Sequence, residues 1–287
     1  TGHQHLVFPN SNDFKGIDEY GKAFLASNLP APFKADVQKI LTQSKSDALG
    51  ELALKSSEET GDVISGLLKV ADENKGQEIG EKALYGAFAA ARDKRDMRKE
   101  REIGERFVKE YAKSQFLSDV MITLGRHAAE AGRFQDAAQW FEQMGRQFAG
   151  DATGLDSLLS SARLRTAMGD YPGAIKVLES TLEQAGPRKA EVLVLMAQTQ
   201  MKMKEPAKAR STAEQALKLD KTNATAAGIV AEVAAANPNE RIEPLVAMMT
   251  TVTNSPNGTG DDAAKGLWYV GDILYWQFKA LPAEKVE

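Results

Sequence analysis

Apolar residues recur along most of this chain at the three-to-four-residue spacing that places them on one face of an α-helix. Ile175, Leu178 and Leu182 form one such run, whereas strand-like alternation is scarce. Breaks such as Gly186-Pro187 and Asn237-Pro238 interrupt the pattern. The intervals between the breaks predict helices of roughly 12 to 15 residues joined by short turns, and hence an all-α fold.

Three blocks, 118–151, 155–188 and 190–223, carry small and large residues at matching positions. A small residue in each block is followed twelve positions later by alanine and sixteen positions later by another apolar residue. These triplets are Gly125, Ala137 and Phe141; Ala162, Ala174 and Leu178; and Ala197, Ala209 and Ala213. Since small residues let two helices approach closely, the blocks predict a series of stacked helix hairpins.

The blocks resemble the tetratricopeptide repeat (TPR) family, whose 34-residue unit is a helix hairpin, and 216–223 resembles the ending of that repeat. The resemblance implies a right-handed α-solenoid, a TPR-like superhelix of hairpins. Degenerate repeats are expected at 81–114 and 224–253, so that the whole array covers 81–253.

Four further segments are expected to flank this array. The pattern predicts a flexible N-terminus over 1–14 and an N-terminal helical extension over 15–80. It also predicts a loop over 254–262 and an aromatic capping helix over 263–287.

Composition excludes several classes of function. The chain has 36 basic and 40 acidic residues, a net charge of −4, so it lacks the positive field that holds nucleic acid. No apolar run reaches the roughly 18 residues that a membrane span requires. Because there is no cysteine, disulfides, thiolate metal sites and cysteine nucleophiles are excluded. We expect no nucleic-acid partner and no membrane span.

Motifs for catalysis or cofactor binding are missing from the sequence, including phosphate loops and the nucleophile elbow. His3 and His5 are too few for a metal site, and His127 with Glu130 is typical of a solvated helix face. The charged stretch 92–102 mixes acids with bases, which favours a solvated turn and helix face over a phosphate site. We therefore expect no metal, no cofactor and no enzymatic activity.

The family resemblance implies a concave groove, lined by the first helix of each hairpin, that binds a partner protein. Carried over by position, one row of the groove is Tyr85, Ile122, Leu159 and Val194, and the row beside it is Ala89, Arg126, Arg163 and Gln198. An apolar row beside a partly basic one suits a peptide or helix with apolar and acidic side chains. Two of these residues, Arg126 and Arg163, are expected to project side by side from adjacent hairpins.

A second apolar surface is predicted near the C-terminus, where 267–278 is apolar or aromatic on almost every side and contains Trp268, Tyr275 and Trp276. A solvated capping helix should be polar outside. The cover could come from another molecule, from the N-terminal helices, or from residues beyond Glu287. Packing within the chain is the interpretation that we favour.

The function favoured by these features is that of a protein-interaction scaffold in bacterial cell-envelope assembly, located in the periplasm or elsewhere in the cell envelope. The turns 110–114 and 147–151 resemble those of envelope-assembly repeat proteins, although alanine stands at Ala112 and Ala149 where those proteins usually have proline. The alternatives are a cytoplasmic scaffold that associates with itself and an accessory domain of a larger protein.

Overall fold

The protein is all-α in the computed structural model, which describes residues 14–28, 30–237, 239–256 and 258–281. Within these ranges there are fourteen α-helices, one short 3-10 helix and no β-strand, so the predicted fold class is confirmed. No helix in the described part of the chain is both long enough and apolar enough to cross a lipid bilayer.

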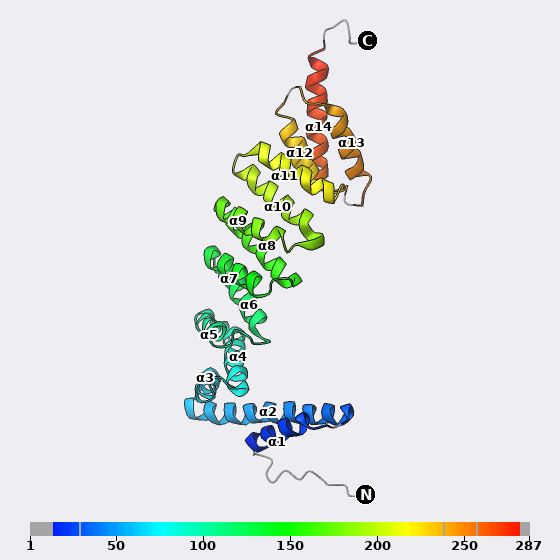
Figure 1. Ribbon diagram of the computed structural model, residues 1–287. Helices are drawn as coiled ribbons and strands as arrows, with labels where there is room; N and C mark the ends of the chain where they lie inside the picture. Colours follow the sequence, from blue (N-terminus) through cyan, green and yellow to red (C-terminus); the bar gives the residue numbers. More distant parts are fainter. Residues whose placement is uncertain (1–13, 29, 238, 257, 282–287) are drawn as a thin grey trace. The chain divides into compact units, whose positions relative to one another are not determined.

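The chain divides into two compact units, Thr1–Met121 and Ile122–Glu287, and the division falls within helix α6 (Leu117–Glu130). Unit 1 contains five complete helices, each packed against the next (Figure 1). They are α1 (Phe14–Ala26), α2 (Ala31–Thr60), α3 (Val63–Glu73), α4 (Glu78–Asp93) and α5 (Met97–Glu110).

Helix α2 is longer than the sequence pattern predicts, because it runs for 30 residues without interruption. Pro32 lies in its first turn, where the missing N–H has no helical partner to lose. The helix ends at Thr60, and the next residue, Gly61, adopts a left-handed φ of 70°. Only Leu41, Ala48 and Ser56 of α2 are buried. Its hydrophobic periodicity is therefore weak, and this is why the pattern did not reveal one long helix.

The hairpin of α4 and α5, together with α3, supplies most of the core of unit 1. Leu84 and Phe88 of α4 and Phe107 of α5 are fully buried, together with Ile64 and Val70 of α3. The degenerate repeat expected over 81–114 thus contains a helix hairpin, with α4 beginning three residues earlier at Glu78.

Unit 2 continues as a series of hairpins and ends in one longer helix (Figure 1). After α6 its elements are α7 (Phe134–Gln147), α8 (Ala152–Ala167), α9 (Tyr171–Leu182), the 3-10 helix η1 (Gly186–Arg188), α10 (Lys189–Lys202), α11 (Pro206–Leu219), α12 (Ala224–Ala234), α13 (Ile242–Thr253) and α14 (Asp261–Lys279). The three best-matched sequence blocks correspond to the hairpins α6/α7, α8/α9 and α10/α11.

Small residues lie in the core of these hairpins, as the repeat pattern predicts. Ala162 and Ala174, like Ala197 and Ala209, are fully buried. At Gly125 a β-carbon would lie 2.8 Å from the ring of Phe141, so the two helices of the α6/α7 hairpin approach closely there.

Four of the hairpins turn through one shared backbone geometry. A residue with positive φ follows the first helix in each: Arg95 at 56°, Gly132 at 73°, Gly169 at 82° and Lys204 at 60°. The next residue donates its N–H to the carbonyl five positions earlier, at 2.8 Å to 3.0 Å in all four turns. This pattern caps the helix end. The charged stretch 92–102 therefore covers the end of α4, the turn at Arg95 and the start of α5.

Candidate functional site

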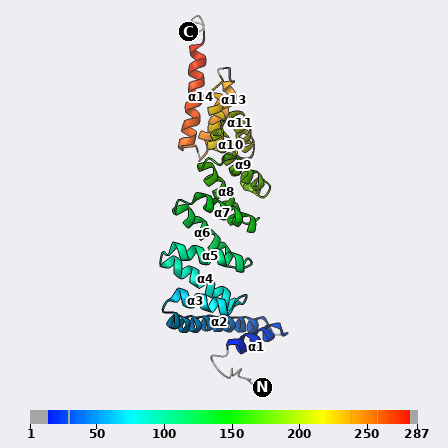
Figure 2. The same cartoon turned by 90° about the vertical axis from the view of Figure 1, so that its left-hand side faces the viewer.

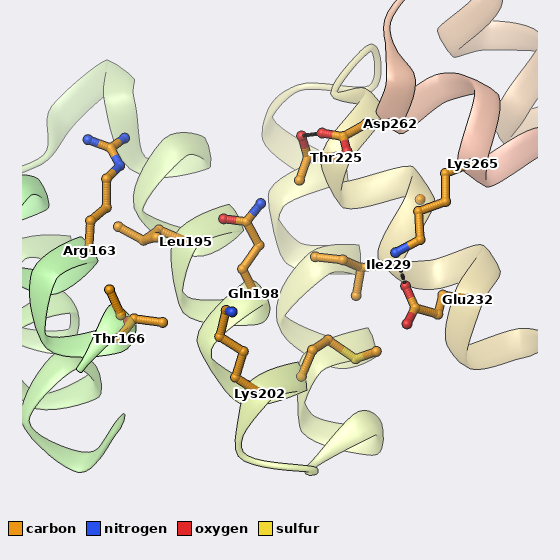
Figure 3. A pocket seen from close by; sticks show the side chains of 13 residues that line it. Arg163, Thr166, Leu195, Gln198, Lys202, Thr225, Ile229, Glu232, Asp262 and Lys265 are labelled. Atoms are coloured by element: carbon orange, nitrogen blue, oxygen red, sulfur yellow. Dashed lines mark hydrogen bonds and ion pairs between the residues drawn. The ribbon is translucent and has the colours of Figure 1, made fainter. Parts of the chain in front are cut away.

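A groove of about 430 Å³ lies along unit 2 and is lined by the first helices of successive hairpins, with α14 closing the series (Figure 3). Its lining residues are Arg163, Thr166 and Ala167 of α8; Leu195, Gln198, Met201 and Lys202 of α10; Thr225, Gly228, Ile229 and Glu232 of α12; and Asp262 and Lys265 of α14. Each helix presents the residues that recur at one-turn spacing on its inner side.

The base of the groove is formed by well-packed residues. Leu195 and Ile229 are almost fully buried and offer only a thin strip of apolar surface. Below them, the hydroxyls of Thr166 and Thr199 lie 3.0 Å apart and are buried, and Thr199 also donates to the carbonyl of Leu195 at 2.8 Å. Because a buried polar pair holds its partners in one geometry, this contact fixes α8 against α10.

Ion pairs along the groove hold several of its charges within the chain. Arg163 Nη2 lies 3.2 Å from Glu191 Oε1, and Arg188 joins Glu191 to Asp156 at 2.7 Å. These four charges connect α8 with α10, and only Arg163 among them lines the groove. Being exposed, they contribute little to folding stability.

The opposite end of the groove carries a second set of polar contacts. Lys265 Nζ lies 2.7 Å from Glu232 Oε2, and the Thr225 hydroxyl donates to the Asp262 carboxylate (Figure 3). The Glu232 carboxylate holds the pKa of Lys265 above its usual value. These contacts tie α14 to α12, so the last helix forms part of the groove wall.

Lys202 is the groove cation without a compensating partner. Its side chain is exposed, and it makes no ion pair or hydrogen bond with any residue in the described part of the chain. Gln198, one turn earlier on α10, is also exposed and has no such partner there. A bound carboxylate would meet an unneutralised ammonium group at this place.

The structure places the predicted groove residues of unit 2 in different environments. Arg163 and Gln198 line the groove. Val194 is half-buried against the core of α10 to α14, and Leu159 is fully buried among residues of α8, α9 and α10. Val192 and Leu195 belong to the same cluster as Leu159. Packing by the next helix thus makes Leu159 a core residue with no exposed surface.

Ile122 and Arg126 lie on α6, outside this groove. Ile122 is half-buried, and Arg126 is exposed with its Nε 4.0 Å from Glu130 Oε1. Arg126 and Arg163 therefore each have an acidic neighbour within the chain, which an acidic partner would have to displace.

Tyr85 and Ala89, the predicted groove residues of unit 1, lie on α4 and are half-buried. The Tyr85 ring stacks on Phe116 with centroids 4.2 Å apart, and its hydroxyl donates to Asp119 Oδ2 at 2.9 Å. Burial, with the adjacent Asp119 carboxylate, raises the pKa of Tyr85. Tyr85 thus connects α4 to the start of α6, and its ring offers little free surface.

The residues of α12 and α14 that line the groove were not predicted from the sequence. The signal was present for α12, since the offsets that select Val194 and Gln198 in the block 190–223 select Gly228 and Glu232 in the weaker block 224–253. Both residues line the groove. The sequence of α14 matches no repeat block, so Asp262 and Lys265 could not be predicted as groove residues.

Three aromatic residues of the predicted second surface, Trp268, Tyr275 and Trp276, lie on α14 and are more than half exposed. The helix packs through its other side, where Ala263, Val270 and Ile273 are buried in the core with α12. Packing within the described residues covers one face of α14 and leaves the aromatic side chains open to solvent.

Of the candidate metal ligands, only His127 and Glu130 lie in the described part of the chain. His3 and His5 lie outside the described residues, and the His127 ring lies 3.9 Å from the Glu130 carboxylate. Groups of three or more histidine, aspartate or glutamate side chains placed to hold a metal ion do not occur in the described ranges.

Comparison with known proteins agrees with the repeat pattern. Residues 165–233, from the end of α8 to α12, match the family model of the tetratricopeptide repeat. This match supports the tetratricopeptide repeat family for the central part of unit 2. No curated protein matches the chain.

Solved TPR structures are similar to the chain at low sequence identity. One is a thermophilic TPR protein of Thermus thermophilus, with 16% identity and a TM-score of 0.39 over 68% of this chain and 99% of that chain. A second is YrrB, a TPR protein with an unusual peptide-binding site, with 13% identity and a TM-score of 0.40 over 63% and 93%. A third is the TPR2AB domain of yeast Sti1 in complex with pHSP90, with 13% identity and a TM-score of 0.36 over 92% and 98%.

Proposed function

We propose that this protein is a non-enzymatic interaction scaffold and that the groove of α8, α10, α12 and α14 binds a peptide or helical segment of a partner protein. The observation that carries the proposal is the groove itself, which has an apolar strip and a cation, Lys202, that has no partner among the described residues. The match to the tetratricopeptide repeat family supports it, because proteins of this family generally mediate protein–protein interaction.

The chemistry of the groove favours a partner segment with apolar and acidic side chains. Its lining includes the cations Arg163, Lys202 and Lys265 and the anions Glu232 and Asp262. Two of the cations already have carboxylate partners. A partner carboxylate gains most at Lys202, where no carboxylate of the described residues has to be displaced, while apolar side chains of the partner cover Leu195 and Ile229.

The cellular setting that we propose is the bacterial cell envelope, with a role in its assembly. The support is the resemblance of the turns 110–114 and 147–151 to those of envelope-assembly repeat proteins. A cytoplasmic scaffold and an accessory domain of a larger protein are the alternatives. Immunoblotting of periplasmic and cytoplasmic fractions from cells that express the native gene separates the first two.

The experiment that tests the groove is selection of peptides from a displayed random library, followed by fluorescence anisotropy with purified variants. The parent chain should select peptides with apolar residues flanking an acidic one. Lys202→Glu should weaken their binding roughly tenfold, about 1.4 kcal/mol, and reduce the dependence of affinity on salt. Lys176→Glu makes the same charge change on α9, where the side chain is exposed outside the groove, and should bind like the parent.

Two results would contradict the proposal. One is that the selected peptides bind Lys202→Glu as tightly as they bind the parent. The other is that Lys176→Glu weakens binding as much as Lys202→Glu does, which would mean that only the net charge of the chain matters.

A further inference from the structure

Helix α14 has two apolar faces, and only one of them is covered within the described part of the chain. The covered face packs against α12 and α13, and Figure 2 shows the other helices of unit 2 on one side of α14 only. The opposite face is exposed. Its main residues are Leu267, Trp268, Gly271, Leu274, Tyr275 and Phe278, and we name them the α14 seam.

The α14 seam follows a heptad spacing. Leu267 and Leu274 are seven residues apart, as are Trp268 and Tyr275, and Gly271 lies midway between Ala264 and Phe278 at the same interval. A seven-residue repeat keeps an apolar stripe facing one partner helix along its length. A face that meets only water needs no such stripe. The spacing therefore indicates that the cover is another helix.

Gly271 independently indicates that another helix approaches the backbone of α14 closely on its exposed face. A β-carbon built at this position would meet nothing within 4 Å, so packing within the chain does not explain the glycine. At Gly266, on the covered face, a β-carbon would lie 2.8 Å from the Met249 side chain. Glycine inside a helix is less stable than alanine, and one use of it is to let another backbone come near.

We propose that the cover is the α14 seam of a second copy of this chain, running antiparallel with the two Gly271 residues facing each other. Counting outward from Gly271, this arrangement places Ala264 opposite Phe278, Leu267 opposite Tyr275 and Trp268 opposite Leu274. Ala264 then faces Phe278 at each end, and a leucine faces an aromatic side chain in each of the other pairs. The same patch serves both copies, as a two-fold interface requires.

Charges at the ends of α14 favour the antiparallel direction. Asp261 lies at the N-terminus of the helix, is exposed, and makes no ion pair with a described residue. Lys279 lies at the C-terminus and is also exposed. Antiparallel pairing brings Asp261 of each copy near Lys279 of the other, whereas parallel pairing would set like charges together.

The exposed area is sufficient for a weak but specific dimer. Trp268, Tyr275 and Phe278 are 64%, 52% and 55% exposed. Since an aromatic side chain buries roughly 150 to 250 Å², these three could bury roughly 300 Å² per copy. Leu267 and Leu274 are each nearly half exposed and add to this area. The total area buried by the two copies would then be roughly 1,000 Å², which is the lower end for biological interfaces. We therefore expect a dissociation constant on the order of 10 μM.

Sedimentation equilibrium of the full chain across this concentration range tests the dimer. The parent should change from monomer to dimer, and Gly271→Leu should raise the dissociation constant at least tenfold, because two leucines cannot fit where two glycines meet. The matched control is Gly50→Leu on α2, also an exposed helical glycine with nothing within 4 Å of its β-carbon. It should dimerise like the parent, and both variants should keep the parent's circular dichroism and melting temperature or exceed them.

Cysteine cross-linking tests the direction in which the two α14 helices pair. The sequence has no cysteine, so only the introduced cysteines can form disulfides. Ala264→Cys and Phe278→Cys should each fail to form a disulfide dimer alone, because a residue and its own copy then lie roughly 21 Å apart along the helix axis. A mixture of the two variants should cross-link under mild oxidation.

The other outcomes would overturn the proposal. If the parent stays monomeric at 100 μM, the seam is covered by the N-terminal helices of the same chain or by a different partner. If each cysteine variant cross-links with itself, the helices run parallel. If Gly50→Leu abolishes the dimer and Gly271→Leu does not, the interface lies in unit 1. The groove proposed above rests on other residues and would stand in each case.

Discussion

Replacing Gly125 with alanine tests whether the close approach of helices in the α6/α7 hairpin is what the small residue provides. The new β-carbon would lie 2.8 Å from Cε1 of Phe141 and 3.1 Å from two further ring atoms. Carbon atoms in good contact are roughly 3.5 to 4.0 Å apart, so the ring or the helix must move by about 0.7 Å.

The expected magnitude combines two opposing effects. Overpacking of this kind costs about 1–3 kcal/mol, while alanine in place of glycine in a helix stabilises by about 1 kcal/mol. Gly125→Ala should therefore lower the free energy of unfolding by about 1 kcal/mol. Phe141→Leu should cost about 1 kcal/mol through lost packing.

The double variant carries the informative result. Gly125→Ala with Phe141→Leu recreates the pair that the next hairpin already has, Ala162 with Leu178, both of which are fully buried. Without the clash, its stability should return close to that of the parent, which gives a coupling energy of about 2 kcal/mol.

Urea unfolding followed by circular dichroism measures all four members of this cycle. Gly50→Ala serves as the control for helix propensity, because a β-carbon at Gly50 meets nothing within 4 Å, and this variant should be stabilised by about 1 kcal/mol. If Gly125→Ala is stabilised as much as Gly50→Ala, or if the two single effects simply add, the ring of Phe141 does not limit the approach of the helices and the reasoning is refuted.

Two further predictions concern local geometry and charge. Lys204 has a left-handed φ of 60° at the position where the preceding hairpin has Gly169, with a φ of 82°. Because glycine adopts this conformation without strain, Lys204→Gly should raise the free energy of unfolding by up to about 1 kcal/mol. Gly169→Ala should lower the free energy of unfolding by about 1–2 kcal/mol, and urea unfolding measures both changes. A hydrogen bond from Lys94, together with the backbone N–H of Ser65, lowers the pKa of Asp62 to about 2. Because this folded-state pKa lies below the usual 3.8, the stabilisation is present above pH 4 and is lost as the pH falls toward 2. Carbon-13 NMR titration of the Asp62 carboxyl should show that pKa, and Lys94→Met should raise it; an unchanged pKa in Lys94→Met would contradict the assigned cause.

The hairpins could be predicted because their signal is local and repeated. Gly125, Ala162 and Ala197 each stand at fixed distances from the residues that their helices cross, so one pattern identifies three hairpins. The 30-residue helix α2 escaped prediction because so little of it is buried that its apolar residues keep no clear period. The turn at Arg95 was also harder to predict than those at Gly132 and Gly169, because arginine, unlike glycine, does not indicate a positive φ.

The groove could be predicted only in part, because burial depends on what the next helix covers. Arg163 and Gln198 line the groove as the family positions imply, whereas Leu159, selected by the same rule, lies under α10. Whether a charge is available is likewise a tertiary property. Arg163 is held by Glu191, while Lys202 has no partner within the described residues, and nothing in the order of residues distinguishes these two cations.

Helix α14 connects the two proposals, because one helix closes the groove and also carries the exposed seam. Lys265 joins α14 to α12 at the groove wall, and the α14 seam lies on a different face of the same helix. A partner segment in the groove therefore does not occupy the seam, and a dimer formed through α14 would hold two grooves in one assembly. A target that presents two copies of the recognised segment could then gain roughly 10² to 10⁴ in apparent affinity without any new contact, provided that its spacing lets both engage. A groove with a thin apolar strip, in which Lys202 has no partner among the described residues, would bind a single segment with modest affinity. Pairing of two grooves would then be the physical means of holding a target firmly while each contact stays weak.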